Sequence, residues 1–540
     1  MRADTLTEPV EGLAEALAAV DALDRALTAG LLRPRPAQAA DLTVLADALA
    51  ASPLATRVAE ATEKAAAGTA AEDHFLALAA ARTALLGAAH DALAERIAEA
   101  VGRTADATGV EWTAVDGEAI TSRGSAEART AGERTGSGDR ASAPAHGATG
   151  TAAQVPARAE APGEGAATPG TPASDTAGEP PTGPGTAAQA PAHEPAPETT
   201  NLRAAARTWL TDLARAGWQG IDHELIAGAA PVVSALLAEP SLRRLAALLD
   251  GFTAELAASC PGTALEMIPA RRWGDLWARG MLLGVPGADA PVAPPGAATG
   301  RLLPLGVDLH EHATAVQAQV HAVFEPADGG APRLVRASVS APKPDTVVGA
   351  GVWQLLRPHM ALLAALGEGR AMELDGMPVT GEGDLLWDDA HARPGEPADA
   401  FTTARVALPT ALTAPTAPLD RHPAQLAVPV LLEGYTAQEG AFVLAGQRLA
   451  VDADRIPVAG PLTPDAVAAS GACIGLLRWD GGRFAVQPLA VETLVRKKPV
   501  ALHAGAWAGG TTDKAGVKAE KAATDAVAVL RERAGRLLRK

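Results

Sequence analysis

The sequence Asp-Leu-His-Glu-His at residues 308–312 is the strongest candidate for metal chemistry. On a β-strand, Asp308, His310 and His312 would share one face, which is how two imidazoles approach a zinc ion. A further ligand would have to come from elsewhere, such as His359 or Asp388. The alternative is a polar strand edge that enters a hairpin, because His-x-His without a further ligand at a defined spacing is a weak motif. We therefore assign no metal or other cofactor, and keep Asp308, His310 and His312 as weak candidate ligands.

A second group of titratable residues is Trp387-Asp-Asp-Ala-His391. Adjacent carboxylates beside a histidine could act as acid and base, or could bind Mg²⁺. Adjacent residues on a strand point to opposite faces, however, and the Arg-Pro-Gly-Glu-Pro sequence that follows is typical of a loop. The pattern favours a solvated acidic loop, so we assign no catalytic residue here.

The sequence lacks the common phosphate-binding and nucleophile motifs. Neither GxxxxGK[ST], GxGxxG nor GxSxG occurs after a predicted strand, and the glycines at 349 and 351 are predicted to form a turn. Cys260 and Cys473 lie among small and apolar residues, which favours buried packing. An enzyme is therefore the less favoured interpretation.

The C-terminal segment is basic. Residues 496–540 carry 11 lysines and arginines against four acids, in a chain whose net charge is −17. From Asp513 the pattern predicts a helix, with Val517, Val527, Leu530 and Leu537 as its larger apolar residues. Such a helix could bind an acidic partner, nucleic acid or an anionic membrane, or could pack on the acidic body of its own chain. The pattern disfavours nucleic acid, because the basic residues are not interleaved with aromatic ones.

The remaining segments define the predicted organisation. Apolar residues at three- and four-residue steps predict a helical bundle over 1–104, with helices at 13–27, 41–51, 56–67 and 72–101. Residues 105–200 are rich in Ala, Gly, Pro and Thr. This composition predicts a disordered, low-complexity linker that tethers its neighbours without fixing their geometry. Helices return over 201–290, with Asn201 as the expected N-cap and Trp273, Trp277 and Met281 as a core stripe.

A two-residue period begins near residue 300. The segments 315–324 and 335–340 alternate apolar and polar residues around a Pro-Asp-Gly turn, which predicts a β-hairpin with His321 on its polar face. A second hairpin is predicted over 474–486, further strands over 426–432 and 442–451, and a helix over 351–366 that Pro358 kinks. The predicted fold class is α+β and multidomain. A mainly antiparallel domain at 291–510 follows the two helical segments and the linker, and a basic helix at 511–540 ends the chain.

The composition of the chain bears on its partners and its cellular location. The acidic pI of about 5.2 disfavours nucleic acid as a partner of the whole chain, and two distant cysteines do not form a disulfide framework. The N-terminus has no apolar signal region, and no run of 18 apolar residues occurs. These features predict a cytoplasmic protein without a membrane span.

Two stretches, residues 31–61 and 321–340, resemble uncharacterised proteins of high-GC bacteria. Those proteins are encoded beside a SWIM zinc-finger protein, a MoxR-type AAA+ ATPase and a von Willebrand A-domain protein. The resemblance implies an accessory component of an ATPase-driven system, with the ATPase or the A-domain protein as partner. We therefore favour a scaffold or adaptor that binds other proteins, with a metal-dependent hydrolase built on Asp308, His310 and His312 as the alternative.

Overall fold

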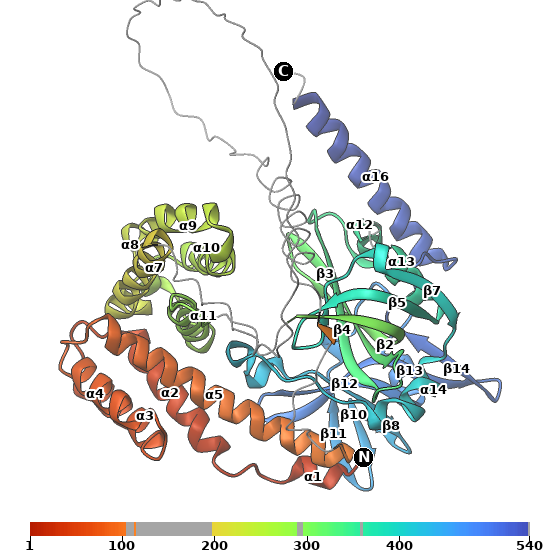
Figure 1. Cartoon of the computed structure of the whole chain (residues 1–540), viewed down its shortest axis with the longest axis horizontal. Coiled ribbons are helices and arrows are strands. Elements are labelled where there is room, and N and C mark those ends of the chain that lie inside the picture. The colour runs from red at the N-terminus through yellow and green to blue at the C-terminus, as the bar shows by residue number, and fades with distance from the viewer. Residues whose placement is uncertain (104–112, 115–196, 289–294, 357–359, 538–540) are drawn as a thin grey trace, which may run out of the picture. The chain divides into compact units, whose positions relative to one another are not determined.

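The computed structural model describes residues 1–103, 113–114, 197–288, 295–356 and 360–537. The segments before and after residues 118–194 belong to one folded unit. Its order along the chain is helices, further helices, two β-sheets and a final helix (Figure 1), so the α+β class is confirmed. The predicted linker at 105–200 lies outside the described residues, except that Thr113–Ala114 forms the short strand β1 and Pro197 begins the next helix.

Ten helices described before residue 290 form the helical part of the unit. The first five are α1 (Ala3–Thr7), α2 (Leu13–Ala29), α3 (Pro36–Ala48), α4 (Ala55–Ala66) and α5 (Glu72–Val101). The next five are α7 (Pro197–Ala216), α8 (His223–Ala227), α9 (Ala229–Ala238), α10 (Arg243–Ala258) and α11 (Ala270–Leu283). The bounds of α5 are those that the sequence predicts. Asn201 is inside α7 and does not cap it.

Helices from both sides of the linker share one hydrophobic core. Leu23 and Phe75 of the first segment belong to the same buried cluster as Trp209, Trp273 and Trp277 of the second. The indole nitrogen of Trp277 donates a hydrogen bond to the carbonyl oxygen of Leu210 at 3.0 Å, which satisfies its buried polar group. The sequence left open whether residues 1–104 pack on the rest of the chain, and this common core shows that they pack with helices of 201–290.

A close backbone contact between these two segments joins the C-terminal ends of α2 and α7. Both helices end at a glycine with positive φ, Gly30 at 85° and Gly217 at 76°. The backbone amide of Leu31 donates to the carbonyl of Ala214 at 3.1 Å, so the chain leaving α2 hydrogen-bonds to the end of α7. A Cβ atom at residue 217 would lie 2.3 Å from the backbone nitrogen of Gly30. Only glycine fits there.

Replacing Gly217 with Ala should therefore lower the free energy of unfolding by roughly 2–4 kcal/mol, from left-handed backbone strain and from overlap with backbone that cannot move cheaply. Gly102 is the matched control, because its φ is 73° but nothing lies within 4 Å of a Cβ there. Gly102→Ala should cost only the backbone strain, about 1–2 kcal/mol. Chemical denaturation measures both; equal losses would contradict the packing argument.

The first β-sheet contains β2 and the strands that pair around it. Its strands are β1 (Thr113–Ala114), β2 (Gly296–Glu311), β3 (Ala315–Pro326), β4 (Arg333–Pro342), β5 (Arg370–Val379), β6 (Asp384–Leu385) and β7 (Ala392–Pro397). Strands β3 and β4 form the predicted first hairpin, with His321 opposite Arg336. Because β5 also pairs with β2, the pairings β2-β3-β4-β6-β5 form a closed circuit.

The second sheet is ordered β8-β12-β13-β11-β10-β9, and β14 also pairs with β13. Its strands are β8 (Val428–Glu433), β9 (Thr436–Gln438), β10 (Ala441–Leu444), β11 (Gln447–Val451), β12 (Ser470–Asp480), β13 (Arg483–Val495) and β14 (Lys498–His503). Strands β12 and β13 are the predicted second hairpin. The predicted single strand at 442–451 is wrong: residues 441–451 form a hairpin, because Ala445 and Gly446 have positive φ and reverse the chain.

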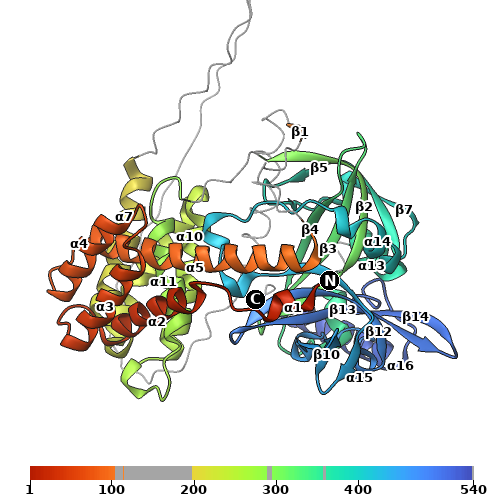
Figure 2. The same cartoon turned by 90° about the horizontal axis from the view of Figure 1, so that it is seen from below.

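Five helices lie among or after the strands: α12 (Val352–Leu355), α13 (Met360–Glu368), α14 (Ala400–Val406), α15 (Pro464–Ala468) and α16 (Lys514–Leu537). Pro358 and its predicted kink lie outside the described residues. One large core includes residues of both sheets, such as Val316 and Val491, and also Leu93 and Ile97 from the second half of α5. Helix α5 therefore contributes to the helical core with one half and to the core of the sheets with the other (Figure 2).

Candidate functional site

Asp308 is at the centre of a buried polar cluster between the two sheets. Its side chain is 4% exposed, and it accepts hydrogen bonds from Arg478 Nη2 at 2.6 Å and Gln487 Nε2 at 2.8 Å. Arg478 also donates to Gln487 at 2.6 Å. Residue 308 is on β2, whereas Arg478 and Gln487 belong to β12 and β13, so this cluster joins the first sheet to the second.

His310 completes the cluster on the solvent side. Its Nε2 lies 3.1 Å from Asp308 Oδ2, and its side chain is 48% exposed. Burial alone would raise the pKa of Asp308. The hydrogen bonds and charges of His310, Arg478 and Gln487 outweigh burial and hold this pKa well below its usual range. Asp308 is therefore an ionised carboxylate whose two oxygens are already engaged by the protein.

The other predicted ligands do not join this cluster. His312 follows the end of β2, and its Nδ1 lies 3.3 Å from Thr314 Oγ1. His359 lies outside the described residues. Among the residues that the structure describes, no group of three or more His, Cys, Asp or Glu side chains is arranged to hold a metal ion. Asp308 is instead one member of a buried ion pair with Arg478, a role that neither sequence interpretation included.

The polar side chains of the Trp387–His391 segment form hydrogen bonds within their own loop or with the neighbouring strand. Asp388 caps a turn by accepting from the amide of Ala390 at 2.9 Å, and Asp389 accepts from the indole of Trp387 at 2.7 Å. The imidazole Nδ1 of His391 lies 2.7 Å from the carbonyl oxygen of Asp375. These contacts stabilise the loop between β6 and β7. Both cysteines are unpaired, with Cys473 buried and Cys260 partly buried.

Arg478 and Gln487 are the residues that sequence reasoning missed. Arg478 is one charge in an otherwise apolar strand, Ala-Cys-Ile-Gly-Leu-Leu-Arg-Trp, and it is 8% exposed. An isolated charge in a buried strand requires a partner, because an unpaired ion in the interior is costly. That signal was present in the sequence, but nothing in it named Asp308 as the partner.

A cavity of about 480 Å³ opens beside the polar face of β3 and β4. Gln319, His321 and Arg336 line its strand side, and the loop at 413–429 lines another side. Arg336 pairs with Asp384 of β6 at 2.7 Å, and both side chains are about two-fifths exposed. Sequence reasoning placed His321 on this polar face but did not predict a cavity.

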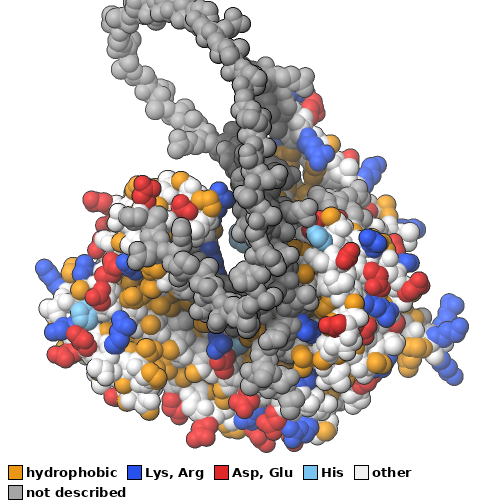
Figure 3. Space-filling model, viewed as in Figure 1, with side chains coloured by type: hydrophobic (Ala, Val, Ile, Leu, Met, Phe, Trp, Pro, Cys, Tyr) orange, Lys and Arg blue, Asp and Glu red, His pale blue; other side chains and the backbone are white. Residues whose placement is uncertain are grey.

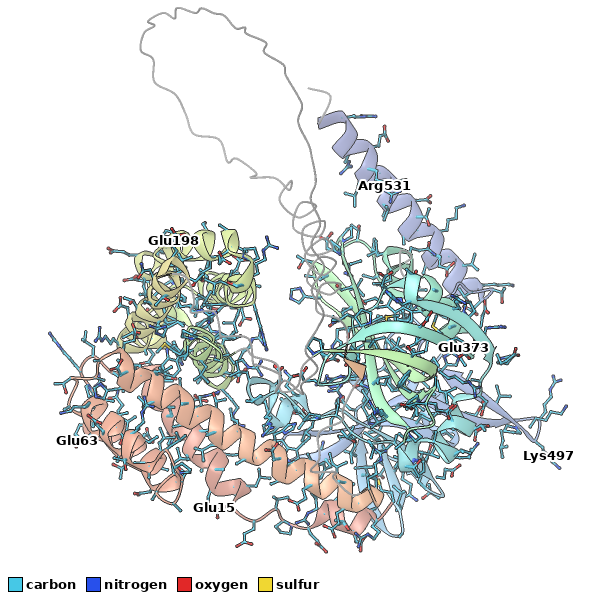
Figure 4. All side chains as sticks on the ribbon, in the orientation of Figure 1. Glu15, Glu63, Glu198, Glu373, Lys497 and Arg531 are labelled. Carbon is cyan, nitrogen blue, oxygen red and sulfur yellow. The ribbon has the colours of Figure 1, made fainter. Side chains whose placement is uncertain are left out.

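Helix α16 carries the predicted basic segment. Its first half packs on η4 (Gly349–Gly351) and α12, where a Cβ at Gly351 would lie 2.6 Å from Ala523 Cβ. Beyond residue 527 every side chain described on α16 is exposed, including Val529, Leu530 and Arg531 (Figure 4). Elsewhere on the visible surface, acidic and basic side chains are interspersed (Figure 3).

No protein-family model, curated protein or solved structure matches this chain. Among the described residues, no helix combines the length and apolarity that a membrane span requires.

Proposed function

We propose that this chain is a non-enzymatic scaffold or adaptor that binds a partner protein through the distal half of α16. The supporting observation is an apolar stripe along α16 that continues beyond the part of the helix that packs on η4 and α12. Gly516, Ala519 and Ala523 recur at three- and four-residue steps on the packed face, and the same steps lead to Val527 and Leu530. Leu530 is 42% exposed. None of the described residues buries this end of the stripe, so it offers an apolar edge to a second protein, as helix-in-groove complexes use.

The charges beside this stripe indicate the partner. Arg531, Arg533 and Arg536 are exposed, and the acid described near them is Glu532, which pairs with Arg536. Arginine is favoured at protein interfaces because its guanidinium group stacks and also pairs bidentately with carboxylates. The partner should therefore present an apolar groove with an acidic rim.

The resemblance of residues 31–61 and 321–340 suggests which partners to test first. It implies a cytoplasmic accessory component of a complex that contains a MoxR-type ATPase or a von Willebrand A-domain protein. The alternative, a metal-dependent hydrolase, has less support, because Arg478 and Gln487 already engage both oxygens of Asp308.

The test is photo-crosslinking in native cells from a benzoylphenylalanine placed at Ala528, followed by mass spectrometry of the adduct. We expect one adduct with a protein that has an acidic surface. The variant Leu530→Asp should lower its yield at least tenfold, by placing a charge in the apolar contact. Val517→Asp is the matched control, because Val517 is 46% exposed on α16 but lies off the stripe. Its yield should equal that of the unaltered chain.

Two results would contradict the proposal: equal losses with Leu530→Asp and Val517→Asp, or an adduct whose yield is unaffected by Leu530→Asp. An adduct with a second copy of this chain would also contradict it, because the proposed occupant is a different protein.

A further inference from the structure

The cavity beside β3 and β4 has the dimensions of a small-molecule site. Its volume of about 480 Å³ lies within the range of about 300–1,000 Å³ that ligand pockets occupy. Besides the two strands and the loop at 413–429, it is lined by His90 of α5 and Arg244 of α10. Helices and a sheet thus converge on it, and this site is separate from the exposed end of α16.

His321 is the side chain that indicates a ligand. It is 1% exposed, it lines the cavity, and its Nε2 has no hydrogen-bond partner among the described residues. A buried polar atom without a partner costs about 1–3 kcal/mol, so native proteins seldom leave one unsatisfied. Gln319 lies two residues away on the same face of β3, where its amide donates to Ser338 Oγ at 3.2 Å. The imidazole and the carboxamide therefore lie side by side on one wall.

Several titratable side chains on the cavity wall have partners within the protein. Arg336 pairs with Asp384 at 2.7 Å, Arg244 pairs with Asp420 at 3.4 Å, and His90 lies 2.9 Å from Asp91. A charged ligand would have to compete with these internal pairs for the same half-exposed side chains. An uncharged polar ligand would leave these pairs intact.

The apolar lining supports the same class of ligand. Leu334, Leu419 and Leu426 line the cavity beside the polar wall. Walls that combine apolar side chains with fixed polar groups are typical of sites that orient a small molecule through one hydrogen-bonding edge.

We propose that this cavity binds an uncharged polar small molecule of about nucleoside size, whose hydrogen-bonding edge meets His321 Nε2 beside Gln319. Nucleosides and neutral heterocyclic amides both have this chemistry. Each of these two classes of compound has charged analogues that differ by one ionic group. The requirement for a neutral ligand can therefore be tested directly.

The experiment is isothermal titration calorimetry of the full chain with adenosine, guanosine, cytidine, uridine and nicotinamide, each compared with its nucleoside monophosphate or with nicotinate. We expect at least one neutral probe to bind, and to bind at least tenfold more tightly than its charged relative. If only a nucleoside binds, the ligand is of the nucleoside class; if only nicotinamide binds, the ligand is a heterocyclic amide.

Two variants locate the binding. His321→Phe removes the unsatisfied nitrogen, and Ala427→Trp fills the cavity from the loop without altering His321. Each should weaken binding at least tenfold. His223→Phe, at an exposed position on α8, is the control and should bind as the unaltered chain does. If His321→Phe fails to fold, Ala427→Trp still decides the location.

Three outcomes would overturn the proposal: no neutral probe binds below about 1 mM, the charged relative binds equally well, or binding survives Ala427→Trp. None of them affects the proposal for α16, because the crosslinking experiment measures a different surface.

Discussion

Replacing Arg82 with Met should lower the free energy of unfolding by about 3–5 kcal/mol. Arg82 of α5 is fully buried in the helical core, where it forms a bidentate pair with Asp24 of α2 at 2.9 and 3.1 Å. It also donates to the carbonyl oxygen of Arg271 at 2.8 Å. The variant would leave the Asp24 carboxylate, which is 2% exposed, without its counter-ion. Burial raises the pKa of Asp24 and Arg82 opposes this rise, so the variant would favour the protonated acid.

Two controls distinguish the stability cost of leaving a buried charge unpaired from the cost of losing an exposed ion pair. Arg25→Met breaks the pair of Arg25 with Asp41, but Arg25 is 61% exposed, so the cost should be at most about 1 kcal/mol. The double variant Asp24→Leu with Arg82→Met removes both buried charges and should recover part of the loss. Denaturation followed by tryptophan fluorescence measures all three, because Trp209, Trp218, Trp273 and Trp277 belong to this core. A loss for Arg82→Met no greater than for Arg25→Met would refute the argument.

Stability should also fall steeply with acid, and His321 should cause much of the fall. The pKa of His321 is lowered to about 3, mainly by burial; Asp308 opposes this shift, and the positive charges of Arg336 and Arg478 add to it. The unfolded chain has an ordinary histidine pKa of about 6.5. Between these two pKa values the unfolded state binds a proton that the folded state excludes. The contribution of His321 to the free energy of unfolding is therefore fully present above about pH 6.5 and is lost as the pH falls.

The expected slope for this one group is about 1.4 kcal/mol per pH unit, or about 3 kcal/mol between pH 6.5 and pH 4.5. His422, whose pKa burial lowers to about 4, adds to the loss in the same direction. Denaturation midpoints at pH 7 and pH 4.5 measure the total. His321→Gln should reduce the difference between them by about 3 kcal/mol, since glutamine does not titrate. His223→Gln, on the surface of α8, should leave it unchanged, and parallel pH profiles for all three chains would show that His321 is not buried in its neutral form.

Local patterns predicted most of the secondary structure. The helix at 72–101 and the hairpin strands β3–β4 and β12–β13 follow from periods of 3.6 and two residues, which depend only on neighbours in the chain. The prediction of one strand at 442–451 was wrong because it runs through Gly446, which with Ala445 forms the turn, although glycine is a turn signal.

The candidate sites were predicted only in part. Sequence placed Asp308 and His310 on one strand face and His321 on the polar face of another strand, and it placed apolar residues along the basic C-terminal helix. It could not place Arg478 beside Asp308, 170 residues away, because the two sheets must pack before these side chains meet. For the same reason it gave no sign of the cavity, whose walls come from α5, α10, two strands and a loop.

The sequence by itself determined the order of helices and strands, the acidic charge of the chain and the basic end, since each is a property of residues near one another in the chain. Tertiary structure alone decided that α2 and α7 meet end to end at Gly30 and Gly217, that Arg82 neutralises Asp24, and that His321 is buried beside a cavity. The physical reason is that burial and charge pairing depend on which distant segments exclude water together, and no local period contains that information.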